Sequence, residues 1–277
     1  MEEVLISSGD ISKGYLILVN KEYPLKGAGV KEKNFHTPLL MAVPQTGLQY
    51  AMGANVKKEG LAKVGEEVYL ENRTASMLMQ LLDDIQARKK IAAVSGYRSF
   101  QEQERIYKDS LSENGKEFTE KFVALPGSSE HQTGLAIDLG EAKEVIDFLC
   151  PEFPYEGICQ DFREKAALFG FVQRYEKEKE DITSIGHEPW HFRYVGYPHS
   201  KIMTEKHLSL EEYEEVIEMH PYGREPLVFT EGKQRVEISY LEMKEGEEAS
   251  LSFPAETLYQ ISGNNKKGII ITQWQRR

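Results

Sequence analysis

Hydrophobic and polar positions repeat along this chain with two different periods, which together predict a mixture of helices and strands. Apolar residues that recur every three to four positions indicate amphipathic helices. This spacing is found in segments 74–90, 100–115, 161–171 and 209–220. Gly115 and Gly170 are expected to end the second and third helices. Ser209 is the expected N-cap of the fourth helix, with a glutamate near the capping-box position.

Short apolar or alternating runs predict strands between these helices. They are YLILV at 15–19, the start of IAAVSGYRSF at 91–100, LAIDLG at 135–140 and HFRYVG at 191–196. Residues 20–60 mix proline, glycine and short apolar runs, which predicts loops with little regular structure.

A second, smaller unit is predicted after the break PYGRE at 221–225. The runs RVEISYLEM, ASLSFP and GIIITQW read as three strands, with NNKKG as the turn before the last of them. We therefore divide the chain into a main domain, residues 1–220, and a small β-rich appendage, residues 221–277. The main domain is predicted to be α+β, because its helices and strands follow no βαβ rhythm.

The net charge of the chain limits the classes of molecule that it is expected to bind. The 277 residues carry a formal net charge of −11. Broad nucleic-acid binding needs a basic stripe, so it is not expected here. An anionic substrate would have to be attracted by a local positive site rather than by the overall field.

The cysteines and the N-terminal segment indicate the cellular compartment in which the protein is expected. Cys150 and Cys159 do not have the spacing of a C-x-x-C pair, which favours two unpaired thiols in a reducing compartment over a disulfide. The first twenty residues lack the features of a signal peptide, and YLILV is too short to cross a membrane. We expect a cytoplasmic protein without a membrane segment; the alternative is the cell envelope, if a signal anchor has been removed.

The stretch HEPWH, residues 187–191, matches the H-E-x-x-H pattern of zinc-protease helices. In that pattern both histidines must share one helical face, but Pro189 disfavours a helix and pushes Glu188 out of helical geometry. The alternating run that follows indicates a strand entered through a bend. His187 and His191 then need not face the same way, so we expect His187 to lie outside a metal site.

Other ligands are expected elsewhere, because catalytic zinc has three protein ligands and an open position. His131 and Asp138 lie in SSEHQTGLAID, where Gly134 allows the backbone to turn into a strand. With His191 they make two imidazoles and one carboxylate, a suitable set for Zn²⁺. Glu188 would lie beside the metal as the base for water. Each residue alone has a simpler explanation, as a surface histidine or a capping acid, so the argument depends on the whole set.

Three motifs carry a family resemblance. They are Ser129, His131, Gly134, Ala136 and Asp138 in S-x-H-x-x-G-x-A-x-D, Glu188 to His191 in E-P-W-H, and Ser95 to Ser99 in S-G-Y-R-S. Together they resemble the VanY, VanX and VanXY zinc D,D-peptidases of vancomycin resistance, over about residues 15–210. Without an N-terminal anchor, the chain is most similar to the VanXY form. The resemblance implies a small central antiparallel sheet flanked by helices, a zinc fold that the Hedgehog signalling domain shares.

The resemblance also implies roles for individual residues. His131, Asp138 and His191 would bind zinc, and Glu188 would act as the base. Arg98 would stabilise the oxyanion, and Ser129 would help to hold the terminal carboxylate of the substrate. Gln103 matches a glutamine that contacts substrate in some members.

Three functions follow from these motifs. The first is hydrolysis of D-Ala-D-Ala dipeptide, of the terminal D-Ala of peptidoglycan precursors, or of both, in glycopeptide resistance or wall remodelling. The second is an L,D-carboxypeptidase or wall endopeptidase of the same fold. The third is a non-catalytic zinc-stabilised binding module. The presence of both Glu188 and Arg98 favours an enzyme.

Overall fold

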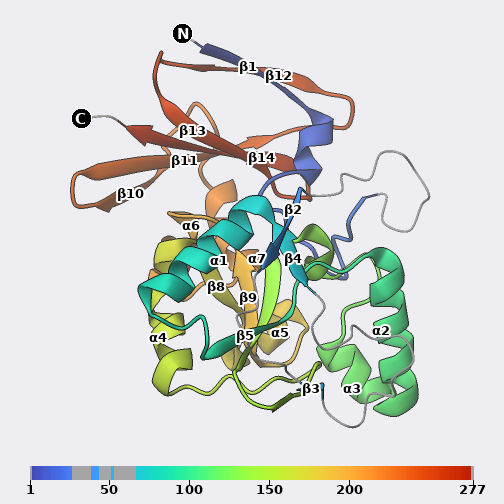
Figure 1. Ribbon diagram of the computed structural model, residues 1–277. Helices are drawn as coiled ribbons and strands as arrows, with labels where there is room; N and C mark the ends of the chain where they lie inside the picture. Colours follow the sequence, from blue (N-terminus) through green and yellow to red (C-terminus); the bar gives the residue numbers. More distant parts are fainter. Residues whose placement is uncertain (1, 27–38, 44–50, 53–66, 276–277) are drawn as a thin grey trace.

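The computed structural model describes residues 2–26, 39–43, 51–52 and 67–275. A main body with a central sheet carries a second β unit, which lies above it in the view of Figure 1. No helix in the described parts of the chain is long and apolar enough to cross a membrane.

The central sheet has four antiparallel strands. Their order is β5 (Ile91–Ser95), β6 (Ala136–Glu141), β9 (Glu188–Tyr194) and β8 (Phe171–Tyr175). The strands predicted near 91 and at 135–140 and 191–196 are therefore confirmed, and with them the α+β class. Pro189 lies inside β9, so the argument against a helix through HEPWH is also confirmed.

Helices cover one face of this sheet. Leu78 and Leu81 of α1 (Asn72–Asp84) and Phe162 of α4 (Gly157–Ala166) form one buried core with Ile137 and Phe192 of the sheet. The alternate strand positions, Asp138 and His191, are thereby directed to the opposite face. The main core thus leaves the second face of the sheet free for polar chemistry.

The remaining elements of the body lie around this core (Figure 1). They are α2 (Phe100–Glu113), α3 (Gly115–Phe122), α5 (Glu180–Thr183), α6 (His199–Lys206), α7 (Leu210–Glu218) and the paired strands β2 (Leu40–Val43) with β4 (Val68–Glu71) and β3 (Ala51–Met52) with β7 (Val145–Ile146). The capping box at Ser209 is confirmed, with Glu212 as its acid. Gly170 adopts the left-handed φ of 89° where the turn after α4 ends, as predicted.

The appendage is a four-stranded antiparallel sheet with a two-stranded ribbon beside it. The sheet order is β10 (Leu227–Glu231), β11 (Gln234–Glu242), β14 (Gly268–Gln275) and β13 (Leu258–Gly263). The ribbon pairs β12 (Glu248–Phe253) with β1 (Glu2–Ser7), so the N-terminal strand packs with the C-terminal unit. The pairing of β1 with β12 adds an N-terminal strand to the β unit. The domain boundary at residue 220 remains a prediction.

The strand predicted at 15–19 is wrong. Leu16 to Val19 are buried, but their backbone pairs with no strand in the described parts of the chain. Instead it bonds to the end of β13 and to the turn that follows: the Leu16 amide donates to Ser262 Oγ of β13, and the Leu18 amide donates to the Asn264 carbonyl. The apolar run is buried as the sequence indicates, but irregular contacts replace a sheet ladder. The loops predicted for 20–60 fall largely outside the described residues.

Two buried side chains attach the appendage to the body. The Asn265 amide donates to the carbonyls of Leu18, Tyr23 and Pro24 at 3.0, 3.0 and 3.2 Å. His199 of α6 lies between Tyr213 Oη, at 2.8 Å, and Thr272 Oγ1 of β14, at 3.0 Å. The appendage therefore supports the segment that leads into the body.

Removing the Asn265 amide should lower stability. Asn265→Ala removes the donor that three carbonyls share and leaves those of Leu18 and Pro24 without it, so we expect a loss of about 1–3 kcal/mol in the free energy of unfolding. Chemical denaturation measures it, with exposed Asn72→Ala as the matched control. Equal midpoints for the two variants would contradict this role.

Candidate active site

The strand register brings the polar groups of the site together. Asp138 of β6 is paired with His191 of β9 on one side and with Ser95 of β5 on the other. Directly opposed residues in antiparallel strands have Cα atoms about 4.5–5.5 Å apart and point to the same face. One aspartate and one histidine therefore meet on the free face of the sheet.

His131 joins them from a short 3₁₀ turn, Glu130–Thr133, which leads into β6. The turn ends at Gly134, whose φ is 72° and whose Cβ, if it had one, would lie 2.9 Å from the Glu71 amide nitrogen. Glycine is thus required for both the conformation and the space. The turn places His131 Nε2 3.1 Å from Asp138 Oδ2.

His131, Asp138 and His191 fit a metal ion. One ligand atom from each lies within 4.8 Å of the others, and all three residues are buried. His131 Nδ1–H donates to the Gly96 carbonyl at 2.7 Å, which leaves the Nε2 lone pair for a cation. Two imidazoles and one carboxylate are typical of a catalytic zinc site that keeps a position open.

Two carboxylates hold the ring of His191. Its Nδ1 lies 2.9 Å from Asp138 Oδ1, and its Nε2 lies 3.3 Å from Glu130 Oε2. Burial disfavours the charged ring, but the two carboxylates prevail and raise the pKa of His191 to about 9. Metal binding at this ring would therefore displace a proton.

Glu188 lies at the start of β9 beside this group without belonging to it. Its Oε2 is 3.5 Å from His191 Nδ1, and its side chain lines the same cavity. Burial raises the pKa of Glu188 to about 8, with Asp138 and Glu130 adding to the rise and His191 and Arg98 opposing it. A carboxyl group that titrates near neutral pH is suited to both taking and giving a proton.

Arg98, Gln103 and Ser129 line this cavity, whose volume is about 40 Å³. Arg98 Nη2 donates to Asp138 Oδ2 at 2.9 Å, and its Nε donates to Ser95 Oγ at 2.7 Å. Gln103 accepts a bond from Arg98 and donates to the Ala124 carbonyl. The structure therefore brings all seven predicted site residues together around one cavity.

The sequence analysis missed a buried group of charges behind His191. Glu130 is paired with Arg174 and Arg193, and Arg174 is also paired with Glu211. One signal was present: Arg193 lies two positions after His191 in an alternating run and so shares its face. The adjacency of Glu130 to His131 was a weaker signal, because it does not reveal the partner across the fold.

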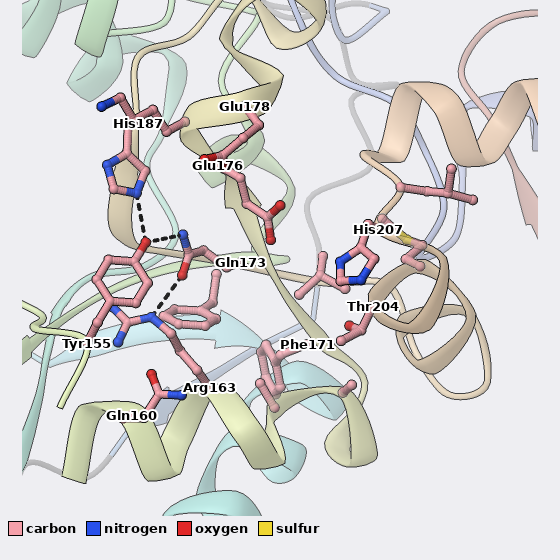
Figure 2. A pocket seen from close by; sticks show the side chains of 17 residues that line it. Tyr155, Gln160, Arg163, Phe171, Gln173, Glu176, Glu178, His187, Thr204 and His207 are labelled. Carbon is pink, nitrogen blue, oxygen red and sulfur yellow. Dashed lines mark hydrogen bonds between the residues drawn. The ribbon is translucent and has the colours of Figure 1, made fainter. Parts of the chain in front are cut away.

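His187 faces a different hollow, shown in Figure 2, with a volume of about 560 Å³. Its Nε2 lies 2.7 Å from Tyr155 Oη, which accepts a bond from Gln173. Arg163, in the same hollow, donates to the carbonyl of Pro189. His187 thus lies apart from the His131, Asp138 and His191 group, as predicted.

Cys150 and Cys159 are both free thiols, which agrees with the interpretation that the sequence favoured.

A buried glutamate held beside an open set of metal ligands, without joining it, is the arrangement by which metal-dependent peptidases activate water. The fold and site define this chain as a member of that class.

Comparison with known proteins identifies the family to which the chain belongs. A family model described as VanY, D-alanyl-D-alanine carboxypeptidase, matches residues 67–197. The bifunctional D-Ala-D-Ala dipeptidase and D-Ala-D-Ala carboxypeptidase VanXYC of Enterococcus gallinarum is 39% identical over 203 residues, which cover 73% of this chain and 94% of the relative. The chain therefore belongs to the VanY family of D-alanyl-D-alanine carboxypeptidases, as the sequence motifs predicted.

Two solved structures are similar to this one. The vancomycin resistance D,D-dipeptidase VanXYg, in complex with a D-Ala-D-Ala phosphinate analog, is 41% identical with a TM-score of 0.84, and the match covers 99% of each chain. The LD-carboxypeptidase LdcB is 34% identical with a TM-score of 0.54, over 72% of this chain and 84% of that chain. The first match includes the β appendage, which the sequence resemblance left out.

Exchanging one histidine at a time tests the ligand set. His191→Ala should abolish stoichiometric zinc binding, whereas His187→Ala should retain it, because only His191 lies in the ligand group. Metal analysis of purified, zinc-dialysed protein is the measurement. Loss of zinc from the His187 variant alone would restore the helical interpretation of HEPWH.

Proposed function

We propose that this chain is a zinc D,D-peptidase that hydrolyses D-Ala-D-Ala dipeptide and removes the terminal D-Ala from peptidoglycan precursors. The observation that carries the proposal is the His131, Asp138 and His191 group with Glu188 buried beside it. The similarity to VanXYC, named for both activities, supports the choice of substrate. Such an activity would contribute to glycopeptide resistance or to wall remodelling, and we propose a cytoplasmic location.

His131, Asp138 and His191 would hold the zinc ion. When bound, zinc supplies a Lewis acid that polarises the scissile carbonyl and makes water acidic enough to attack near neutral pH. Neutral imidazoles and a single carboxylate leave the occupied site with a net positive charge, although the chain as a whole is acidic. The anionic end of the peptide is therefore attracted locally.

Glu188 takes the proton of the attacking water and later gives one to the leaving D-alanine amine. Its buried carboxyl, with a pKa near 8, can change protonation state in the pH range of the reaction. The hydrogen bonds of His191 and Asp138 hold the neighbouring side chains in place, so Glu188 needs little rearrangement to act.

Arg98 stabilises the negative charge that develops on the carbonyl oxygen, and Ser129 contributes to binding the terminal carboxylate. The bonds of Arg98 to Ser95 and Asp138 fix its guanidinium before substrate arrives, which is the preorganisation that such catalysis requires. Gln103 is proposed as a substrate contact, although both ends of its amide are bonded within the protein.

The cleft continues beyond the metal site, which supports action on substrates longer than a dipeptide. A second cavity of about 220 Å³ shares Val123, Ala124, Tyr175 and Ile185 with the first. Its outer wall includes Asn20 and Lys21. This space would hold the part of a pentapeptide stem that precedes the scissile bond, while Ser129 in the first cavity contributes to binding the terminal carboxylate.

L,D-carboxypeptidase activity is the second candidate, because the LD-carboxypeptidase LdcB has a similar fold. Parallel assays of zinc-loaded protein separate the two, with D-Ala-D-Ala and a pentapeptide ending in it against a tetrapeptide ending in L-Lys-D-Ala. Hydrolysis of the tetrapeptide alone would reject the first proposal. Hydrolysis of none of them would favour a binding module.

Glu188→Ala tests the assigned base. Turnover of D-Ala-D-Ala should fall by about 10²–10⁴-fold, the usual contribution of general acid–base catalysis. Zinc content should be unchanged, because Glu188 is outside the ligand group. Glu178→Ala is the matched control, since Glu178 is exposed on the other hollow. Unchanged turnover in the Glu188 variant would sink the assignment.

Leu125→Trp tests the extended cleft. Leu125 lines the second cavity only, so the larger ring should raise KM for the pentapeptide by about tenfold, equivalent to roughly 1.4 kcal/mol of binding. Hydrolysis of the dipeptide should be unaffected. Leu111→Trp is the control, because Leu111 is similarly exposed, at 37% against 38%, and is not among the residues that line the cavity. An equal loss for both substrates would contradict the proposed path.

A further inference from the structure

Glu130 has no role in the chemistry described so far, yet its side chain is completely buried next to the metal site. Its Oε1 accepts from Arg174 Nε at 2.9 Å and from Arg193 Nη1 at 2.8 Å. The side chains of both arginines are at most 1% exposed. A buried carboxylate with two guanidinium partners is held in a single position, because any rotation would break a charged hydrogen bond.

The second oxygen of Glu130 is directed at His191. Oε2 lies 3.3 Å from His191 Nε2, while His191 Nδ1 lies 2.9 Å from Asp138. The two ring nitrogens therefore face two different carboxylates. Nδ1 is the nitrogen that faces Asp138, a member of the ligand group, so Nε2 can donate its proton to Glu130.

We propose that Glu130 is a positioning residue for the metal site, acting through His191. Its carboxylate accepts the Nε2 proton, fixes the tautomer of the ring and keeps the Nδ1 lone pair directed at the cation. Carboxylates that accept from a metal-bound histidine orient the ring and raise its basicity. This inference rests on the proposed zinc site but not on which peptide is hydrolysed.

The arginines connect this position to distant parts of the chain. Arg174 also donates to both carboxylate oxygens of Glu211 on α7, at 2.9 and 2.7 Å. Arg193 donates to the carbonyls of Tyr15 and Ile17, at 3.0 and 2.8 Å. The orientation of one metal ligand is therefore fixed from a helix and from the N-terminal segment together.

A simpler role must be separated from this one. Glu130 and Glu211 balance the charges of Arg174 and Arg193, so Glu130 could be required only for neutrality. Glu211 provides the matched control, because it shares Arg174 but is not bonded to His191. A charge-balancing role predicts the same effect for both acids, whereas positioning predicts an effect on the metal for Glu130 alone.

The first test measures zinc affinity by chelator competition on Glu130→Gln and Glu211→Gln, with folding followed by circular dichroism. We expect affinity to fall by about 10–100-fold in the Glu130 variant and to stay near the wild-type value in the Glu211 variant. The Co²⁺-substituted Glu130 variant should also show an altered visible absorption spectrum. Equal losses in the two variants, or no loss in either, would overturn the proposal.

The second test uses the wild-type protein, so it holds even if Glu130→Gln does not fold. Nitrogen NMR of the zinc-loaded, histidine-labelled chain reports which nitrogen of His191 carries the proton. A slowly exchanging Nε2 proton with a metal-bound Nδ1 is expected, and the reverse assignment would overturn the inference. Both tests measure the metal site and not hydrolysis, so they remain informative if no peptide is hydrolysed. Failure of the proposed function can therefore be distinguished from failure of this inference.

Discussion

The pairing of Asp138 with His191 across β6 and β9 is the constraint on which the site depends. A one-residue slip of β9 against β6 would turn the side chains of β9 to the other face of the sheet. Phe192, which now packs in the core beneath the helices, would then face the site, and His191 would leave it. The hydrophobic packing of α1 and α4 against one face therefore holds the candidate metal ligands on the other, so stability and the proposed chemistry depend on the same alignment.

The buried acids of this acidic chain differ in their charged partners, and two of them are paired with arginine. Asp138 is paired with Arg98, and Glu130 is paired with Arg174 and Arg193. Burying an unpaired charge would cost several kcal/mol, and these pairs avoid that cost through short, charge-assisted hydrogen bonds. Glu188 lacks such a pair, and burial accordingly raises its pKa to about 8. The difference in partners is what separates the structural carboxylates from the one proposed to transfer protons.

Local signals in the sequence predicted the candidate ligands and base, because their spacing and residue types are those that zinc chemistry requires, and the structure brings these residues together. Their roles remain predictions. Pro189 and the alternating run after it argued against a helix through HEPWH, and β9 confirmed a strand. The role of Glu130 could not be predicted, since it depends on a contact with His191 that exists only in the folded sheet. The run at 15–19 was predicted to be a strand because it is short and apolar, whereas its backbone partners are Ser262 of β13 and Asn264 in the turn that follows. Long-range contacts, rather than periodicity, decided these last two cases.

The pairing of β1 with β12 has a consequence for the order of folding. Glu2–Ser7 is synthesised before the central sheet, but its partner strand is synthesised only after the whole of that sheet. Until then its edge is open, and an unpaired strand edge invites association with other chains. Closing so long a loop is also slow relative to local helix formation. Completion of the β unit would therefore be a late event, in which β1 pairs with β12 after the body that carries the site has formed.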